Sequence, residues 1–381
     1  MMRSPRALQR ILRAPSELGL GRAYVTGDLD IDGDVYSVLG LRDVRSDLNI
    51  GLKEWLAIGR AAARVGALRP GRLTPPPEEA RLQGRRHSRA RDRAAISHHY
   101  DVGNDFYRLV LGPTLTYSCA YFSSPDQSLE EAQRDKIELI CRKLRLRPGE
   151  RVLDVGCGWG TLAIHAAQRY GVNVVGVTLS QPQADLAAKR AAEAGIGDKV
   201  EIRVQDERDV DDGPYDAISS IGMFEHVGAA RLSEYFRHLH ELLRPQGRLL
   251  NHGISRPPGA ERARFARRGF IDSFVFPDGE LHEAGKVVSS VQDAGFEVRD
   301  VESLREHYAL TLRNWVSNLE ADHERAIELA GEGRYRVWRL YMAASALNFE
   351  AGRTQVHQIL AVRADDGVSS VPLRRGDIVL T

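Results

Sequence analysis

The chain has 381 residues, of which 43% are hydrophobic and 28% are charged, and its formal net charge is +1. A chain of this length exceeds the usual single domain, so two domains are expected. It has only three cysteines and no CxxC pair, which argues against a disulfide framework or a structural zinc site. Neither a membrane span nor a secretory leader is evident, so we expect a cytoplasmic protein.

Basic residues concentrate in the first quarter of the chain. Residues 1–95 carry 18 Lys and Arg against 11 Asp and Glu, a balance of +7 that leaves −6 for the rest. Six of these arginines lie in residues 81–93, just after three consecutive prolines, so we expect an Arg-rich linker over 81–95. A solvated linker is the simplest interpretation. Contact with anionic phospholipid headgroups is an alternative, and the charge alone would equally suit nucleic acid.

The residues before this linker predict a small α+β module over residues 1–80. Residues 28–41, DLDIDGDVYSVLGL, predict a turn and a short strand. Residues 48–68 predict an amphipathic helix because their apolar positions recur at helical spacing.

After the linker, predicted strands and helices alternate. Residues 128–146 predict a helix that begins with the capping-box pattern SLEE. Strands are then expected over 151–157, 173–179, 200–206, 215–224 and 247–255, with helices over 160–170, 181–195 and 230–245. This alternation is typical of a doubly wound α/β fold with a mostly parallel sheet, here assigned to residues 96–381.

Residues 152–160, VLDVGCGWG, place three glycines between a predicted strand and a predicted helix. Glycines at such a junction let backbone amides approach a ligand at the helix N-terminus. The spacing is GxGxG rather than the GxGxxG of dinucleotide folds, and no acid follows the next strand to bind a dinucleotide ribose. Asp154 before the first glycine suits a cationic ligand. The pattern therefore favours S-adenosylmethionine.

Six segments in order resemble the cyclopropane-fatty-acyl-phospholipid synthases, relatives of the mycolic acid cyclopropane synthases. They are HYDVGNDFYRLVLGPTLTYSCAYF (99–122), VLDVGCGWG (152–160), GVTLSQPQ (176–183), IGMFEHVG (221–228), NHGIS (251–255) and FIDSFVFPDGEL (270–281). The resemblance covers about residues 95–360. It implies a class I methyltransferase fold, Rossmann-like with a doubly wound, mostly parallel seven-stranded sheet, preceded by an N-terminal module that binds lipid or an interface.

The resemblance also implies which residues bind S-adenosylmethionine. They are Tyr117, Ser118, Asp154, Gly156, Gly158, Thr178, Gln183, Asp206, Glu207 and Ile221. Asp206 is expected near the adenine. The family commonly has an aromatic residue where Glu207 stands, so the chain departs from the family pattern there.

As the resemblance implies, the reaction transfers a methylene group to a cis double bond in a phospholipid acyl chain. The alkene attacks the sulfonium methyl, and loss of a proton from the resulting cation closes the cyclopropane ring. The family binds bicarbonate as the base, and the matching ligands are Glu225, His252 and Tyr308 with backbone groups of Cys119 and Ile254. Glu225 must then be protonated or hydrogen-bonded to the bicarbonate proton, since two bare anions would repel. No metal site is expected.

The strip TYSCAYF (116–122) raises the question of whether Cys119 is a nucleophile. A thiolate beside a sulfonium and a carbocation would risk capturing either one, and no histidine at local spacing serves as its base. We therefore expect a neutral Cys119 that contributes only its backbone. Aromatic faces would stabilise the cation, with candidates Tyr117, Tyr121, Phe122, Phe224 and Tyr308.

Other functions remain open from the sequence. The same cation could give a 10-methylene or methyl-branched chain after a hydride shift. A small-molecule N- or O-methyltransferase, or a lipid-binding protein with a vestigial cofactor loop, would share the fold.

The expected partner is unsaturated phospholipid, contacted peripherally at the inner face of the membrane. Residues 262–279, RARFARRGFIDSFVFPDG, alternate Arg with Phe and are expected to cover the acyl pocket at the bilayer surface. No nucleic acid partner is expected, and a homodimer is possible.

Overall fold

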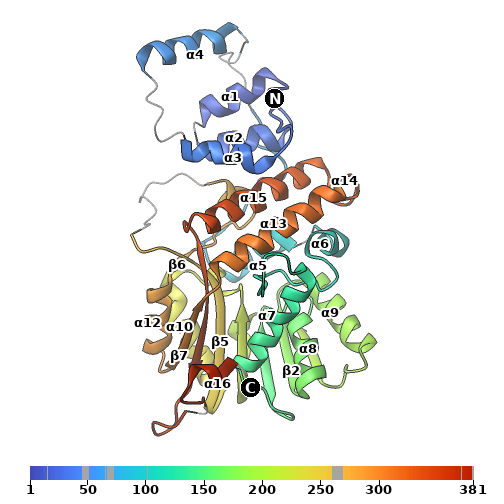
Figure 1. Ribbon diagram of the computed structural model, residues 1–381, viewed down its shortest axis with the longest axis vertical. Coiled ribbons are helices and arrows are strands. Elements are labelled where there is room, and N and C mark those ends of the chain that lie inside the picture. The colour runs from blue at the N-terminus through green and yellow to red at the C-terminus, as the bar shows by residue number, and fades with distance from the viewer. Residues whose placement is uncertain are drawn as a thin grey trace.

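The computed structural model describes residues 1–14, 16–44, 51–64, 66, 73–100, 102–259, 269–369 and 371–379. In Figure 1 a helical N-terminal module lies at one end, a twisted sheet at the other, and a layer of long helices between them. None of the helices in these residues is long and apolar enough to cross a bilayer.

The sheet confirms the predicted α/β alternation. Its main path runs β3 (Val200–Val204), β2 (Asn173–Thr178), β1 (Arg151–Val155), β4 (Tyr215–Ile221), β5 (Leu243–Arg256), β8 (Gln355–Val362) and β7 (Glu297–Ser303). The first five strands are parallel, whereas β8 is antiparallel to β5 and β7. The two-residue strand β6 (His282–Glu283) pairs with the end of β5, so the described sheet has eight strands rather than the predicted seven.

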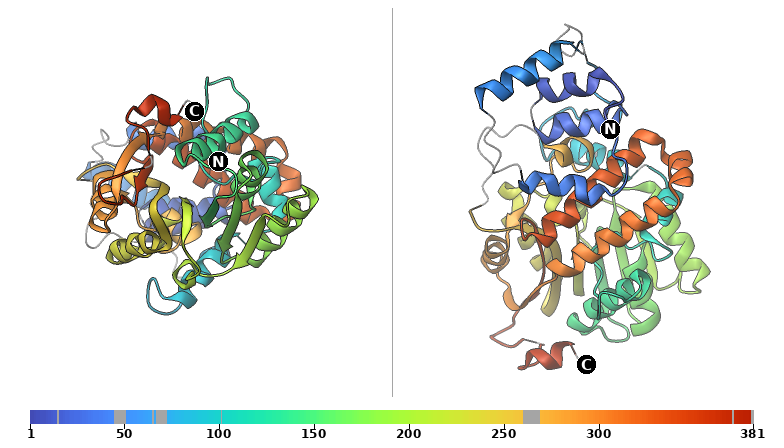
Figure 2. Two further views of the ribbon diagram at one scale, coloured as in Figure 1. Left: turned by 90° about the horizontal axis from the view of Figure 1, so that it is seen from below. Right: turned by 45° about the horizontal axis from the view of Figure 1, so that its top comes forward.

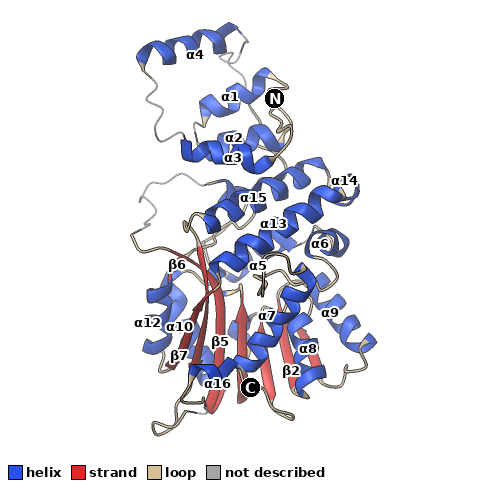
Figure 3. Ribbon diagram, viewed as in Figure 1, coloured by secondary structure: helices blue, strands red, loops and turns tan. Residues whose placement is uncertain are grey.

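Helices cover both faces of the sheet, as Figure 3 shows. On one face α7 (Leu129–Lys143) and α8 (Thr161–Tyr170) pack on Val152 and Val174. On the other, α10 (Leu232–Leu242) and α12 (Ala284–Asp293) pack on Leu153 and Val175. α9 (Gln181–Glu193) lies beside β2 and β3. Successive apolar residues of one strand point to opposite faces, which is why the buried strands read as continuous apolar runs.

A layer of helices covers the end of the sheet where the parallel strands finish. α13 (Arg305–Ala321), α14 (His323–Ala330) and α15 (Glu332–Glu350) form it together with α5 (Arg89–Tyr100), α6 (Asn104–Leu111) and α11 (Phe270–Phe274). The right-hand view in Figure 2 shows this layer between the N-terminal module and the sheet. Short α16 (Arg375–Val379) packs at the far end, against α7.

In the residues that the structure describes, the N-terminal module consists of helices and loops, with one isolated β-bridge between Met2 and Leu29. It contains α1 (Pro5–Arg13), α2 (Glu17–Val25), α3 (Val35–Val44) and α4 (Leu52–Arg64), so the predicted amphipathic helix is confirmed. The strand predicted within residues 28–41, and with it the α+β class of the module, is wrong. The Asp34 carboxylate accepts hydrogen bonds from the N–H groups of Tyr36 and Ser37. These bonds cap a helix start that outweighs the β-prone residues after it.

The module docks on α15 through polar contacts and close packing. Arg336 of α15 donates to the Tyr24 carbonyl and to Asp30 Oδ1, both at 3.1 Å. A Cβ on Gly21 of α2 would stand 2.2 Å from the Phe270 ring, so α2 and α11 touch closely.

The segment predicted as a linker over residues 81–95 is partly folded. α5 begins at Arg89, and Arg91 is buried in an ion pair with Asp278, which also pairs with Arg86 at 3.0 Å. Arg89 pairs with Asp209 at 2.8 Å. The interpretation as a solvated linker is therefore wrong for Arg91, whereas the side chains of Arg86 and Arg89 are more than half exposed. Their ion pairs tie the segment to the α/β domain.

Candidate active site

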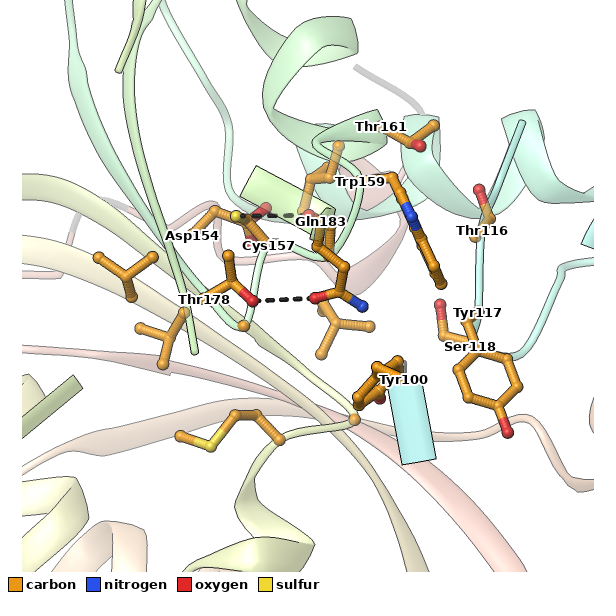
Figure 4. Close-up of a pocket in the computed structure, with 18 of the residues that line it drawn as sticks. Tyr100, Thr116, Tyr117, Ser118, Asp154, Cys157, Trp159, Thr161, Thr178 and Gln183 are labelled. Atoms are coloured by element: carbon orange, nitrogen blue, oxygen red, sulfur yellow. Dashed lines mark hydrogen bonds between the residues drawn. The ribbon is translucent and has the colours of Figure 1, made fainter. Parts of the chain in front are cut away.

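A cavity opens at the carboxyl ends of β1, β2, β3 and β4, beneath α5. This edge is where open α/β sheets bind their ligands. Nine of the ten predicted cofactor residues line it: Tyr117, Ser118, Asp154, Gly156, Gly158, Thr178, Gln183, Glu207 and Ile221. Figure 4 shows Tyr117 and Ser118 on one side and Asp154, Cys157 and Thr178 on the other. The tertiary structure thus brings these predicted residues together.

The glycine loop has the conformation that its sequence predicts. Gly156, Gly158 and Gly160 have φ of +76°, +55° and +75°, values that side chains rarely adopt. The Gly156 and Cys157 amides both donate to the Val177 carbonyl, at 2.9 and 3.0 Å, which fixes the loop on β2. A Cβ on Gly156 would lie 3.1 Å from the Met223 side chain. The loop therefore needs glycine at Gly156 for backbone conformation and for space.

Two polar groups at the ends of the strands are held in fixed orientations. Thr178 Oγ1 donates to Gln183 Oε1 at 2.9 Å, which leaves the Gln183 amide nitrogen as a donor (Figure 4). Asp154 Oδ1 accepts from Ser219 Oγ at 2.7 Å. Burial raises the pKa of Asp154 to about 6. A cationic ligand beside Asp154 would favour its ionised form.

Asp206 is the predicted cofactor residue that does not line the cavity. Its carboxylate accepts from the N–H and from Nε of Arg208, at 3.1 and 2.7 Å. Glu207 lines the cavity instead. Burial and the neighbouring Asp206 raise the pKa of Glu207. Arg208 also reaches Asp92 of α5 at 3.2 Å, so this loop is tied to the helix above the cavity.

Glu225 follows β4 in a short 3-10 helix and is buried. Its Oε1 accepts the N–H of Ile254 at 2.7 Å. Its Oε2 is buried without a hydrogen-bond partner among the described residues. Burial raises the Glu225 pKa to about 7. Ile254, whose backbone was predicted to contact bicarbonate, thus orients Glu225 through its N–H, and Oε2 is left for a further partner.

Tyr308 of α13 and Cys119 lie near Glu225. Burial raises the pKa of Tyr308 well above its usual range, and Tyr341, Cys119 and Glu225 add to the effect, as expected for groups around one buried site. The Cys119 thiol donates to the Ala120 carbonyl at 3.2 Å, and burial raises its pKa. The thiol is therefore neutral and turned toward backbone, in agreement with the prediction that it is not a nucleophile.

His252 stands on β5, opposite Ile221 of β4 and Gln358 of β8. The Gln358 amide nitrogen lies 3.3 Å from His252 Nδ1. When that amide donates, the neutral ring carries its proton on Nε2 as a donor. Burial lowers the His252 pKa well below its usual range, and the charges of Lys136 and Lys143 add to this effect. No hydrogen bond joins His252 to Glu225 or Tyr308 in the described residues.

Aromatic side chains cluster beside the cavity. Tyr117 Oη lies 3.1 Å from His99 Nε2 and 3.4 Å from Tyr341 Oη, and its ring packs on Trp315 and Trp338. Among the predicted cation-stabilising residues, Tyr117 and Tyr308 have ring contacts with Trp315 of this cluster. Phe122 packs on Ala120 and Ala132 instead, Phe224 packs against Gly253, and Tyr121 lies against His307.

Several residues of the site were not predicted. Tyr100, Lys136, Cys157, Trp159, Gln205, Met223 and His226 line the cavity, and Trp338 and Tyr341 join the aromatic cluster. The glycine-loop motif could have indicated Cys157 and Trp159, and the HYD segment could have indicated Tyr100. Nothing local to α7 or α15 separates Lys136 or Tyr341 from ordinary helix residues.

The first part of the predicted cover over 262–279 lies outside the described part of the chain, which omits residues 260–268. Phe270 and Phe274 are buried and stack on one another with ring centroids 4.8 Å apart. They pack in the core beside α2.

The fold and the cavity together define a class I S-adenosylmethionine-dependent methyltransferase fold. The structure is similar to that of the mycolic acid cyclopropane synthase CmaA1 complexed with SAH and CTAB, at 38% identity and a TM-score of 0.67 over 71% of this chain and 98% of that one. A coclaurine N-methyltransferase bound to N-methylheliamine and SAH shares the fold at 20% identity, with a TM-score of 0.68 over 90% of this chain and 98% of the other.

The chain belongs to the mycolic acid cyclopropane synthetase family, which matches residues 87–359. A probable fatty acid methyltransferase of Mycobacterium tuberculosis is 44% identical over 98% of this chain and 89% of its own length. A probable fatty acid methyltransferase of Pseudomonas putida is 42% identical over 96% and 88%. The cyclopropane mycolic acid synthase 3 of M. tuberculosis is 39% identical over 69% and 94%. The similarity to the two fatty acid methyltransferases therefore includes the N-terminal module.

Proposed function

We propose that this protein transfers a methylene group from S-adenosylmethionine to the cis double bond of an unsaturated phospholipid acyl chain and so forms a cyclopropane ring. The observation that carries the proposal is the buried Glu225 carboxyl, whose Oε2 has no partner among the described residues and whose pKa burial raises to about 7. A carboxyl in this state can donate to a small anion that serves as base.

The predicted bicarbonate ligands carry the donor groups that this anion would need. Glu225 in its protonated form is a donor, neutral His252 with its proton on Nε2 is another, and the Tyr308 hydroxyl is a third. Bicarbonate, when bound there, supplies a base for the acidic cation of the substrate. Holding the base in place matters more than its strength, because a protonated cyclopropane gives up its proton readily.

The cofactor cavity fits S-adenosylmethionine, which when bound supplies an electrophilic methyl group. Asp154 puts a carboxyl beside a cationic ligand. The Gln183 amide and the glycine loop offer neutral donors in fixed orientations. The chain's role is to orient the ligand and to exclude water from the reacting centre.

The neighbouring aromatic cluster suits a cationic intermediate. Tyr117 and Tyr308 present ring faces, each stabilising a nearby cation by about 0.5–2 kcal/mol. The Cys119 thiol is uncharged and turned toward backbone carbonyls, so it does not compete for the cation. Charge stabilisation without a nucleophile is what the ring closure requires.

A second product has support from the comparisons. Two relatives that match nearly the whole chain are described as probable fatty acid methyltransferases. The same cation, after a hydride shift, can lose a proton from the new methyl group and give a 10-methylene chain. Alternatively, it can lose a proton from a neighbouring chain carbon and give a methyl-branched unsaturated chain. The substrate and the site are the same in both cases, and only the fate of the cation differs.

Contact with a membrane follows from the substrate. A phospholipid acyl chain reaches the cavity only if the protein meets the bilayer surface at the inner face of the membrane. Exposed Leu20, Val38, Leu41 and Leu56 place apolar side chains on the N-terminal module. We assign this module to the interfacial contact.

The experiment offers vesicles of a cis-monounsaturated phospholipid to the protein with S-adenosylmethionine carrying a trideuterated methyl group. The acyl chains are then analysed by mass spectrometry and proton NMR. Cyclopropane formation retains two of the three deuterons and gives ring resonances. A 10-methylene product has the same mass with alkene resonances, and a methyl branch retains all three deuterons.

Vesicles of saturated phospholipid are the control and should take up no label. Label confined to headgroups or to soluble amines, with none in the acyl fraction, would contradict the proposal. Co-sedimentation with the vesicles tests the membrane contact separately from turnover.

A further inference from the structure

A buried lysine lies in the wall of the cofactor cavity, on the inner side of α7. Lys136 is 3% exposed and lines the cavity together with Ser118. Its Nζ donates to Ser118 Oγ at 2.8 Å. Burial lowers the Lys136 pKa to about 8, so the amine is still mostly protonated at neutral pH.

This ammonium group has no carboxylate partner in the described part of the chain. Among the residues that the structure describes, no carboxylate oxygen lies within 4.0 Å of Lys136 Nζ. Lys143, two turns further along α7, is also fully buried but pairs with Asp300 at 3.2 Å and Glu302 at 2.5 Å. A buried cation with no carboxylate in contact is costly, which indicates that a contacting counter-ion arrives with a ligand.

The charged and titratable groups around Lys136 come from several elements. Asp154 on β1, His252 on β5, Cys119 on the strip and Cys141 on α7 all face it. Of these, Asp154 is the one carboxyl, and its Oδ1 already accepts from Ser219. One end of the cavity thus presents a positive group at Lys136 and an acidic group at Asp154, the charge pattern that complements an amino-acid zwitterion.

Lys136 is not needed to hold the strip in place. Gln133, one turn earlier on α7, is fully buried and donates to the carbonyls of Leu111 and Thr116 at 3.1 and 3.3 Å. Its Oε1 accepts from Thr114 Oγ1 at 2.5 Å. Gln133 therefore tethers the strip through neutral hydrogen bonds, whereas Lys136 donates to a side-chain hydroxyl, that of Ser118, and to no backbone carbonyl among the described residues.

We propose that Lys136 is a positioning residue for the amino-acid end of S-adenosylmethionine. It orients the Ser118 hydroxyl and supplies the positive charge that selects the carboxylate of that end. The inference rests on the proposed cofactor. In this proposal Lys136 acts through Ser118, and this role explains why a charged side chain is buried on α7.

The test measures the affinity of two probes by calorimetry. One is S-adenosylhomocysteine, and the other is its decarboxylated analogue, S-adenosyl-3-thiopropylamine, which keeps the amine and the nucleoside. The wild-type chain should prefer S-adenosylhomocysteine by roughly 10- to 100-fold, the range for a hydrogen bond to a charged group. Lys136→Met should reduce that preference to about 3-fold or less. Ser118→Ala should reduce it in the same direction.

Thermal unfolding of the unliganded protein separates this role from a structural one. Methionine fills the same volume without a buried charge, so Lys136→Met should unfold at the same temperature as the wild type or higher. Gln133→Met is the matched control from the same helix. It should lower the unfolding temperature and leave the preference between the probes unchanged.

The proposal is overturned if Lys136→Met keeps the wild-type preference, or if it weakens both probes equally. Loss of the preference in Gln133→Met to the same extent would also overturn it. A wild-type chain that binds neither probe would contradict the proposed function itself. If Lys136→Met does not fold, Ser118→Ala is used instead, and an unchanged preference for S-adenosylhomocysteine over the decarboxylated analogue overturns the proposal.

Discussion

The cofactor cavity and the Glu225 corner lie close together in this protein but are built in different ways. Nearly half of the cavity lining comes from one run of consecutive elements, from β1 through the glycine loop to β2 and α9. The Glu225 corner joins side chains of residues far apart in sequence, such as Cys119 and Tyr308. Substitutions around Glu225 should therefore lower the rate of turnover, whereas substitutions in the glycine loop should lower the affinity for the cofactor.

The largest effect is expected for Glu225→Gln. The amide keeps the shape of the side chain but cannot exchange a proton with an anion, so turnover should fall by about 10²- to 10³-fold. The affinity for S-adenosylhomocysteine should stay within about 2-fold, since Glu225 does not line the cofactor cavity. Single-turnover assays and calorimetry measure the two quantities. Glu283→Gln, at an ion pair with Arg256, is the control and should leave turnover unchanged.

The second prediction concerns pH and stability. The Glu225 pKa is about 7 in the folded chain, above the usual value of 4.5, so the folded state holds this proton more tightly than the unfolded state. Below the unfolded pKa of 4.5 both states are protonated, and burial of Glu225 costs no stability through this proton. The free energy of unfolding falls as pH rises above 4.5, and the loss is complete once pH has passed about 7. The loss is on the order of 3 kcal/mol.

Chemical denaturation of the wild type and Glu225→Gln between pH 5 and 8 measures this effect. The difference between their free energies of unfolding should change across that range. Asp154, whose pKa is about 6, contributes to both proteins and cancels. A difference that does not vary with pH would contradict the assignment of a protonated Glu225.

Two glycine substitutions probe the cavity side of the comparison. Gly156→Ala combines a φ of +76° with a Cβ 3.1 Å from Met223, so it should weaken S-adenosylhomocysteine binding by about 10-fold or more. Gly158→Ala is the matched control, because its φ of +55° carries similar strain but no atom lies within 4 Å of the added Cβ. Equal losses would show that backbone strain alone, and not the contact with Met223, decides the effect.

The smallest effect is expected for Cys119→Ser. A serine hydroxyl can donate to the same carbonyl as the thiol does, so turnover should stay within about 3-fold of the wild type. Loss of turnover with intact fold and S-adenosylhomocysteine binding would contradict the assignment of Cys119 as a neutral group.

The sequence alone determined the α/β domain and most of the cofactor site. Strand and helix periods, the glycine spacing and the capping box are local, so β1, the loop, α8 and β2 could be located without coordinates. The helix over Val35–Val44 was missed because its residues favour a strand, and only the cap by Asp34 decides the outcome.

The tertiary structure decided the parts that depend on which distant side chains meet. It gave Lys136 a hydroxyl partner and no carboxylate, and it turned the Ile254 N–H toward Glu225 rather than toward a ligand. In the folded chain Asp206 also pairs with Arg208, and Glu207 lines the cavity. No local pattern encodes these contacts, because burial and charge at such positions are set by elements that come together only in the folded chain.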